Sequence, residues 1–386
     1  MKKILIVSNT NPNSNPRPNR MIHWLKDHYE VEVVGLKKLD IDGIKSHVIE
    51  PFPPVRNART FFLTLKRIIK RNINLPMKNY EEVNWSRLGN ARNLANQLMG
   101  NHYDLIISHD LVLLPFIFMI KNETTRVLFD AREYYPRNFD DNLYWKLTKK
   151  TVNHYLCSTY LHRCDKMITV SQGLADEYQR EYGVKAEVVM SLPYPQNIFP
   201  SQPEPGVIRM IHHGNASPSR KTEMMIEMMD FVDDRFTLDL MMMVINRTYW
   251  NKIVKMVEQR PNVRIVPPVS MQEIVPTISH YDIGLFLVPP TNFNLKHTLP
   301  NKLFEFIQAR LAVAIGPSID MKKIVDQYKC GIVSSEFNPQ SLAAELNKLT
   351  MERIAELKGN SNRAASELNA EVSGKRVQKI VSELID

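Results

Sequence analysis

The sequence predicts an α/β protein made of two Rossmann-like, doubly wound domains that face each other across a cleft. Three observations support this fold class: short apolar runs alternate with helical patterns, a proline-rich stretch separates two such series, and the chain has 386 residues. Strands that are covered by helices on both faces are apolar throughout, and strands alternating with helices are typical of parallel sheets. A chain of this length is too long for one ordinary domain and sufficient for two.

Ten segments have the pattern of buried strands, five in each half of the chain. The first five are residues 4–8, 31–35, 104–108, 126–130 and 167–170, and the second five are residues 208–212, 236–243, 263–266, 283–288 and 312–315. Helical patterns at residues 20–29 and 143–164 lie between strands of the first series.

The proline-rich segment at residues 191–206 is predicted to be the linker, because proline stiffens the chain and cannot donate to a sheet ladder. We therefore expect an N-terminal domain at residues 1–200 and a C-terminal domain at residues 201–373. The amphipathic residues 374–386 are expected to form a helix that crosses back to the N-terminal domain. In open α/β folds, ligands bind at the carboxyl ends of the strands, so a site in the cleft is expected.

Several classes of protein are disfavoured by the sequence. No apolar run approaches the roughly 20 residues that span a membrane, and the run from Ile4 to Val7 is too short for a signal peptide. Cys157, Cys164 and Cys330 have neither metal nor disulfide spacing, which suits a reducing compartment, so we expect a cytoplasmic protein. The chain has no GxGxxG, Walker A or HExxH motif, which argues against a dehydrogenase, a P-loop NTPase and a zinc peptidase.

The formal net charge of +9 is concentrated in a basic tract. Between Pro51 and Tyr80 no residue is acidic, and the cations are Arg56, Arg59, Lys66, Arg67, Lys70, Arg71 and Lys78. On a helix, one face would be apolar and the neighbouring face basic, as in an interfacial helix or a helix packed on its own domain. The apolar face comprises Phe61, Leu65, Ile68, Ile69 and Ile73. The open interpretations for residues 56–73 are a solvated helix face, an anionic membrane and an anionic acceptor; nucleic acid is disfavoured, because aromatic residues are confined to Phe61 and Phe62.

The segment HTLPNKLFEFIQARLAVAIGP, residues 297–317, has the pattern of a helix followed by a buried strand. Pro300 suits the first helical position, so the amides of Asn301 and Lys302 would face an anion. Glu305 lies one turn further on, where a carboxylate can accept two ribose hydroxyls. The alternative is an ordinary capped helix with Glu305 in a surface ion pair.

A second segment, HHGNASPSRKTEMMIEMM at residues 212–229, predicts a strand that ends at His212, a loop, and a helix that begins near Lys221. Arg220 and Lys221 would supply fixed cations to a diphosphate. The alternative, a basic helix start without a ligand, is disfavoured because cations are unfavourable at the positive end of a helix.

These two segments resemble the nucleotide-binding elements of retaining glycosyltransferases of the GT-B fold, of the family 4 type. The resemblance implies that Glu305 binds the ribose of the donor. His297 falls where the family has a glutamate that touches the donor sugar. Because of this departure, the resemblance does not determine which sugar is donated. The residues that the resemblance assigns to the donor diphosphate are Gly214, Asn215, Arg220, Lys221, Asn301 and Lys302.

Stretches of the N-terminal half resemble the same family. In YDLIISHDLVLLP, residues 103–115, His109 matches the family's active-site histidine, so His109 and His297 are the catalytic candidates. VLFDAREYYP, residues 127–136, places Arg132 and Glu133 on the acceptor side, and residues 167–184 resemble the helix start before the linker. In the loop NTNPNSNPRPNR, Arg17 and Arg20 either face an acidic acceptor or fasten the first helix to the sheet.

The resemblance implies a hexosyltransferase-like enzyme that moves a sugar from a nucleoside diphosphate sugar to a glycan or lipid-linked acceptor. It further implies retention at the anomeric carbon, no metal and no cofactor, with the donor bound by the C-terminal domain. Bacterial surface polysaccharide synthesis, at the inner face of the membrane, is the expected setting. Two alternatives remain: a sugar-nucleotide epimerase on the same scaffold, and a non-catalytic nucleotide-sugar-binding subunit of a polysaccharide assembly complex.

Overall fold

The computed structural model describes residues 1–53 and 55–386, which divide into two compact units. The first unit comprises Met1–Val189 and Gly374–Asp386, and the second comprises Met190–Ser373. The division thus lies at Val189 and not near residue 200. The Val189 amide donates to Thr169 O (2.8 Å) and its carbonyl accepts from Arg17 (2.7 Å), which keeps the chain in the first unit up to this point. The proline-rich segment that follows belongs to the second unit, where Leu192 joins the hydrophobic core.

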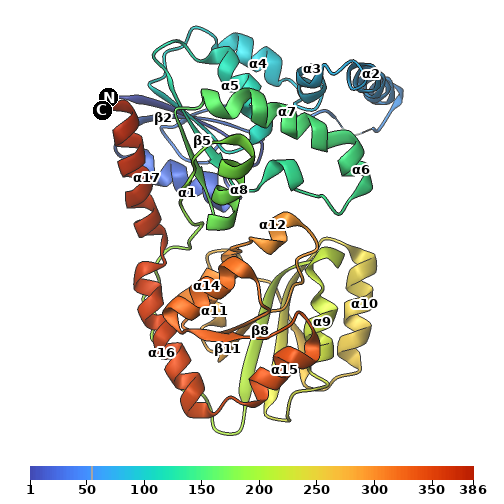
Figure 1. The fold of residues 1–386 in the computed structure, drawn as a ribbon, viewed down its shortest axis with the longest axis vertical. Helices are drawn as coiled ribbons and strands as arrows, with labels where there is room; N and C mark the ends of the chain where they lie inside the picture. Colours follow the sequence, from blue (N-terminus) through green and yellow to red (C-terminus); the bar gives the residue numbers. More distant parts are fainter. Residues whose placement is uncertain (54) are drawn as a thin grey trace. The chain divides into compact units, whose positions relative to one another are not determined.

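The first unit contains a parallel sheet of seven strands in the order β3-β2-β1-β4-β5-β6-β7 (Figure 1). The order reverses between β1 and β4, which creates a topological switch point at the carboxyl ends of these strands. The strands are β1 (Lys3–Val7), β2 (Glu30–Gly35), β3 (Lys45–Val48), β4 (Leu105–Ser108), β5 (Arg126–Ala131), β6 (Lys166–Thr169) and β7 (Glu187–Val188).

The second unit contains a parallel sheet of six strands in the order β10-β9-β8-β11-β12-β13. Its switch point lies between β8 and β11, and the strand order in both units is that of a Rossmann fold. The strands are β8 (Ile208–Ala216), β9 (Phe236–Val244), β10 (Val263–Val266), β11 (Ile283–Phe286), β12 (Ala312–Ile315) and β13 (Gly331–Val333). The predicted α/β fold class of two Rossmann-like domains is confirmed.

All ten predicted strands are present, and three strands were missed. The missed strands β3, β7 and β13 each pair with a single neighbour, and β7 has only two residues. Edge strands are short and half-buried, so they lack the continuous apolar run that marks a central strand. One predicted strand was too short: β8 continues to Ala216, so Gly214 and Asn215 lie in the ladder with β9 and not in a loop.

Helices connect the strands and cover the sheets. Those of the first unit are α1 (Pro16–Leu25), α2 (Ala58–Asn74), α3 (Tyr80–Trp85), α4 (Ala91–Leu98), α5 (Leu114–Ile120), α6 (Leu143–Trp145), α7 (Thr151–Tyr160) and α8 (Gln172–Tyr182). Those of the second unit are α9 (Thr222–Met228), α10 (Arg247–Glu258), α11 (Ile274–Ile278), α12 (Phe293–Lys296), α13 (Asn301–Gln308), α14 (Ile319–Tyr328), α15 (Pro339–Asn347) and α16 (Met351–Glu367). The last helix, α17 (Ala370–Ile385), begins in the second unit and continues into the first. None of the helices in residues 1–53 and 55–386 is both long enough and apolar enough to cross a bilayer.

Two helix starts differ from the prediction. Helix α1 begins at Pro16, four residues before the predicted start, because the Asn15 side chain caps the amide of Arg17 and proline suits the first turn. Helix α13 begins at Asn301, so Pro300 is the N-cap residue and not the first helical residue. The predicted helix at residues 143–164 is present as α6, a π-helical turn at Lys146–Lys150, α7 and a short 3₁₀ turn.

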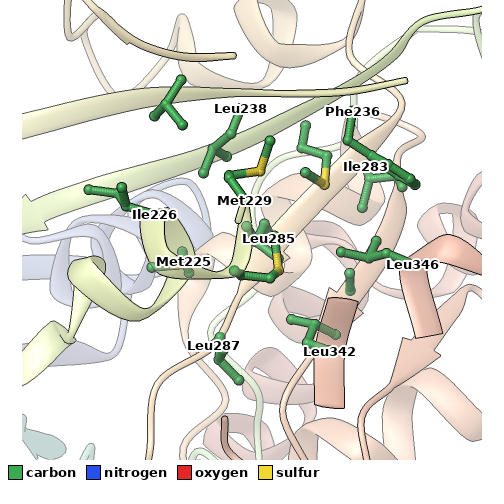
Figure 2. Close-up of a cluster of buried hydrophobic side chains, with 14 of the residues drawn as sticks. Met225, Ile226, Met229, Phe236, Leu238, Ile283, Leu285, Leu287, Leu342 and Leu346 are labelled. Atoms are coloured by element: carbon green, nitrogen blue, oxygen red, sulfur yellow. The ribbon is translucent and has the colours of Figure 1, made fainter. Parts of the chain in front are cut away.

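Hydrophobic clusters cover both faces of the second sheet. Figure 2 shows one of them, in which Met225 and Ile226 of α9 meet Leu238 of β9 and Leu285 of β11. The opposite face packs against α11, α13 and α14. In the first unit, Val377, Ile380 and Val381 of α17 enter the core beside β1, which explains why residues 374–386 belong to that unit.

Gly284 of β11 determines how closely α13 approaches the second sheet. A Cβ atom at this position would lie 2.2 Å from Cγ of Phe306, within the ring's own volume. Phe306 itself is fully buried in the core between α13 and the sheet. Helix α13 therefore packs directly on the backbone of β11, which decides where its N-terminus lies.

We predict that Gly284→Ala lowers the free energy of unfolding by about 1–3 kcal/mol, because the added methyl overpacks the contact with Phe306. The matched control is Gly359→Ala, in the interior of α16, where an added Cβ would meet nothing within 4 Å. That control is expected to be neutral or to stabilise by up to about 1 kcal/mol. Denaturant unfolding of both variants tests the prediction, and equal effects would contradict it.

Candidate functional site

Helix α13 begins at the switch point of the second unit without a capping side chain. Pro300, its N-cap residue, has an extended backbone (φ −72°, ψ 148°) and no side-chain hydrogen bond to the first turn. The amides of the first turn and the positive end of the helix dipole favour an anion there. Asn301 and Lys302, both half-buried, are the first two residues of this turn.

Lys302 lies against the backbone of Gly214. A Cβ atom on Gly214 would be 2.8 Å from Nζ of Lys302, and the φ of 135° at Gly214 is one that favours glycine. The ammonium also lies over the ring of Phe286, 5.0 Å from its centroid. Burial lowers the pKa of Lys302 to about 7; the charge of Arg220 lowers it further and that of Glu305 opposes the shift. An anion bound at this point would favour the protonated, charged form of Lys302.

Arg220 and Lys221 follow the end of β8. Arg220 ends a short 3₁₀ turn, and its charge depresses the pKa of Lys302, so the two cations are close in space. Lys221 is the N-cap residue of α9 and has a left-handed backbone (φ 48°), which turns the chain from the 3₁₀ turn into the helix. Asn215 is exposed and pairs with Met243 of β9, so its backbone belongs to the sheet.

Glu305 is buried one turn into α13, and its Oε2 lies 3.3 Å from Nε2 of His213. Burial, together with the charge of Lys302, lowers the pKa of His213 to about 3, so this imidazole is neutral. Nδ1 of the neighbouring His212 donates to Leu285 O (2.8 Å), while its buried Nε2 has no hydrogen-bond partner among residues 1–53 and 55–386. Buried polar atoms usually have hydrogen-bond partners, and ligands of such sheets bind at the switch point, so Nε2 of His212 is a candidate for contact with a ligand.

His297 interacts with α14. Its Nδ1 lies 3.0 Å from Oδ2 of Asp320, and its ring packs against Phe293. The other oxygen of Asp320 accepts from Lys323 Nζ at 3.1 Å. Because a carboxylate only accepts, the hydrogen bond places a proton on Nδ1 of His297 and orients Nε2 as the other functional nitrogen.

Asp130 is the centre of a buried ionic cluster in the first unit. Arg17 donates to both of its oxygens, at 2.6 Å each, and Nδ1 of His109 lies 2.8 Å away. Burial would raise the pKa of Asp130, but Arg17 and His109 outweigh it and hold that pKa well below its ordinary value. These contacts favour the alternative interpretation of Arg17, in which this arginine fastens α1 to β5.

His109 itself has no exposed surface. Its Nε2 has no hydrogen-bond partner within the described part of the chain, and its carbonyl accepts from the Nε of Arg132 and the hydroxyl of Tyr135, each at 3.1 Å. Arg132 also donates to Asp110 at 2.6 Å. Arg132 is thus a half-buried positioning group for the turn after β4.

The other two acceptor-side candidates are Arg20 and Glu133. Arg20 is buried on α1, so like Arg17 it does not have the exposure of a surface contact to an acceptor. Glu133 is half-buried after β5, and its carbonyl accepts from the hydroxyl of Tyr178 at 2.8 Å.

Four residues of these clusters were not identified from the sequence: Asp130, His213, Phe286 and Asp320. Asp130 stands in the quoted 127–136 segment, and His213 stands beside His212 at the end of a predicted strand, so both had a local signal. Asp320 and Phe286 had none, because they reach His297 and Lys302 only through tertiary packing. No group of three or more His, Cys, Asp or Glu side chains in residues 1–53 and 55–386 is arranged to hold a metal ion.

We predict that Asp130→Asn destabilises the first unit by about 3–5 kcal/mol at pH 7, because Arg17 is left buried without its counter-charge. The pKa of Asp130 is lowered in the folded state, so this stabilisation is complete above the ordinary pKa of 3.8 and is lost only as the pH falls below it. Denaturant unfolding at pH 7 measures the effect. Asp326→Asn, which breaks an exposed pair with Lys322, is the matched control and should change stability by less than about 1 kcal/mol.

Comparison with known proteins connects this geometry to a family. Residues 35–193 match the family model of Glycosyltransferase Family 4. No protein among the curated sequences matches the chain.

Several solved structures have a fold similar to that of this chain. HepE from Anabaena in complex with UDP-glucose has a TM-score of 0.71 at 11% identity, covering 99% of this chain and 100% of that one. Sucrose-phosphate synthase from Thermosynechococcus elongatus has a TM-score of 0.72 at 11% identity, covering 100% of this chain and 99% of that one. A mutant of S. aureus TarM, in complex with fondaparinux, alpha-GlcNAc-glycerol and UDP, has a TM-score of 0.59 at 12% identity. That match covers 78% of this chain, which spans 59% of the length of TarM.

At these identities the structural likeness shows the fold alone. The family match over residues 35–193 nevertheless agrees with the fold, which consists of two parallel sheets with the strand order of Rossmann domains. This chain therefore resembles the family 4 type of glycosyltransferase: it has the GT-B fold, and its residues 35–193 match the Glycosyltransferase Family 4 model.

Proposed function

We propose that this chain is a glycosyltransferase that moves a sugar from a nucleoside diphosphate sugar to a glycan or lipid-linked acceptor. The observation that carries the proposal is the anion site of the second unit. There the N-terminus of α13, which has no capping side chain, carries Lys302. The charge of Arg220 contributes to the lowered pKa of Lys302. Gly214 leaves room beside the lysine, and the site lies at the switch point, where ligands of such sheets bind.

In this proposal the protein acts mainly on the leaving group. Departure of a nucleoside diphosphate leaves an oxocarbenium-like sugar and places negative charge on the diphosphate. Lys302, Arg220 and the first amides of α13 stabilise that charge more strongly as it grows, and Lys221 adds a cation from the start of α9. Two or three fixed cations supply the charge that a metal provides in other enzymes, so we propose a reaction that needs no metal. We also propose that the reaction retains the anomeric configuration.

The ribose and the sugar are assigned to neighbouring residues. We propose that Glu305 accepts the ribose hydroxyls, since its carboxylate lies one turn below the diphosphate site and beside a neutral imidazole. His297, oriented by Asp320, is proposed to contact the donor sugar, and His109 is proposed to act from the first unit. Glu133 is retained as an acceptor-side candidate, with Arg132 positioning its turn. A lipid-linked acceptor would suit bacterial surface polysaccharide synthesis.

The proposal is tested by a thermal-shift screen of UDP-, GDP-, ADP- and CMP-sugars, because a ligand of the folded state raises the melting temperature by mass action. The nucleotide sugar with the largest shift is then assayed for transfer to glycan and lipid-linked acceptors, with and without EDTA. We expect one nucleotide class to stabilise the protein and transfer to persist in EDTA. If no nucleotide sugar shifts the melting temperature, the proposed donor site is wrong.

We predict that Glu305→Ala weakens binding of that nucleotide sugar by about tenfold to a hundredfold, the effect of losing a charge-assisted hydrogen bond. Isothermal titration measures the affinity, and the melting temperature of the unliganded variant checks that the buried position tolerates the change. Glu258→Ala, an exposed glutamate of α10, is the matched control and should bind normally. Unchanged affinity in Glu305→Ala would remove this residue from the site.

The lowered pKa of Lys302 makes donor affinity depend on pH. The anion needs the ammonium form, which predominates below pH 7 and is lost in the free protein as the pH rises above it. We therefore expect affinity for the nucleotide sugar to fall about tenfold between pH 6 and pH 8. The phosphate groups of a nucleotide sugar do not titrate in this interval, so they do not obscure the effect.

Isothermal titration at both pH values separates Lys302 from its neighbours. Lys302→Gln should bind weakly and with little dependence on pH. Lys296→Gln, an exposed lysine of α12, should keep the wild-type profile. A wild-type affinity that is constant from pH 6 to pH 8 would contradict the assignment of Lys302 to the diphosphate.

A further inference from the structure

Helix α2 has an unusual orientation: its apolar side faces away from the protein. None of the 17 residues of α2 is buried. Its half-buried residues, which mark the side turned toward the rest of the unit, are polar: Thr60, Thr64, Arg67, Arg71 and Asn74. The apolar side chains are all more than a third exposed, and they are Phe61, Phe62, Leu63, Leu65, Ile68, Ile69 and Ile73.

This orientation excludes one of the two interpretations of the amphipathic pattern. A helix packed on its own domain buries its apolar stripe, because that burial is what stabilises it. Here Phe62 is 65% exposed and Ile73 is 55% exposed, while the Thr64 hydroxyl donates within the helix to Thr60 O. The apolar stripe of α2 is therefore available to something outside this unit.

A second element extends the apolar surface. Leu143, Tyr144 and Leu147 of α6 and the following turn are each more than 60% exposed, whereas Trp145 between them is buried and anchors the segment. Nη1 of Arg71 on α2 donates to the hydroxyl of Tyr144 at 3.1 Å, so the two elements are neighbours (Figure 1). We call the apolar side chains of α2, together with Leu143, Tyr144 and Leu147, the α2–α6 surface.

Cations outnumber acids around the α2–α6 surface, where the nearby acids are Glu82, which pairs with Lys70, and Asp140 and Asp141, which precede Leu143. Residues 51–79 contain seven cations and no acid, and Lys146, Lys149 and Lys150 follow Tyr144 along the chain. Lys70 pairs with Glu82 and Arg71 binds Tyr144. In contrast, no ion pair of Arg56, Arg59 or Lys66 is present among the residues that the structure describes. These three cations are exposed and available to an anionic partner.

We propose that the α2–α6 surface binds the face of an anionic lipid bilayer, with the apolar side chains inserted among the acyl chains and the cations at the headgroups. An exposed apolar stripe bordered by lysine and arginine is the pattern of an interfacial helix, and large exposed apolar patches mark interaction surfaces. A second copy of this chain would bring seven cations against seven. A nucleic acid would leave the apolar stripe unused. A bilayer surface matches both halves of the pattern, because it offers an apolar interior and anionic headgroups together.

Co-sedimentation with vesicles tests the proposal without any sugar substrate, so its result is independent of the proposed transferase activity. We expect the wild-type chain to bind vesicles of 70% phosphatidylcholine and 30% phosphatidylglycerol at least tenfold more tightly than pure phosphatidylcholine vesicles at low salt. High salt should weaken this preference, because exposed charges are screened. Each exposed cation near the surface contributes about fivefold, so Arg56→Gln/Arg59→Gln/Lys66→Gln should reduce binding on the order of a hundredfold. Ile69→Ser/Ile73→Ser should reduce it by about fivefold for each side chain.

The matched controls remove the same groups elsewhere on the molecule. Lys185→Gln/Lys255→Gln/Lys375→Gln removes three exposed cations, and Phe231→Ser/Val372→Ser removes two exposed apolar side chains. Both controls should bind vesicles like the wild type. The proposal is overturned if the wild type fails to bind anionic vesicles at low salt, or if the cation control loses as much binding as the α2 variant. It is equally overturned if the protein is a dimer that Ile69→Ser/Ile73→Ser dissociates, since the surface would then be occupied by a second copy.

Discussion

Phe306 lies directly over the backbone of Gly284, and this contact seats α13 on the second sheet. The helix has only eight residues, so its position on the sheet decides where its first turn lies. That turn carries Lys302 to the backbone of Gly214 and Glu305 to the ring of His213. A side chain at position 284 would move the helix away from β11, and with it Asn301, Lys302 and Glu305, which we assign to the nucleotide. The donor site therefore depends on a contact that itself touches no ligand.

The cluster around Lys302 places a buried lysine within reach of the charge of Arg220. In the unfolded chain a lysine titrates near 10.5, whereas burial, together with the charge of Arg220, lowers the pKa of Lys302 to about 7 in the folded protein, and Glu305 opposes the shift. Between these two values the unfolded chain binds more protons, so this group favours unfolding, and its unfavourable effect disappears as the pH rises through the interval. A buried cation near a second cation is costly, and negative charge close by reduces that cost. Such a local conflict with stability is expected at functional sites.

The ionic cluster of the first unit has the opposite character. Asp130 is fully buried, but Arg17 and His109 satisfy its charge, and the carbonyl of Val189 takes another donor of the same guanidinium. Its pKa is lowered and its charge is matched, so it contributes to stability at neutral pH. The two arginines differ in role: Arg17 forms an ion pair that stabilises the fold, whereas the charge of Arg220 lowers the pKa of Lys302. Nε2 of His109, which has no hydrogen-bond partner within residues 1–53 and 55–386, is the feature of the first cluster that points beyond structure.

Local patterns in the sequence were sufficient for the two domains, ten of the strands and the helix that starts after Pro300, because periodicity and capping depend on neighbours along the chain. The family resemblance grouped Gly214, Arg220, Lys302 and Glu305, since two short segments carry all four. Local patterns could not identify the edge strands β3, β7 and β13, whose few residues are half-buried, nor the placement of Arg17, whose partner Asp130 lies 113 positions away. They also could not decide which side of α2 faces the protein, because an amphipathic pattern shows that two faces differ and not which face has a partner. Only tertiary packing decides such questions, since burial and ion pairing depend on groups that are distant in the sequence and adjacent in space.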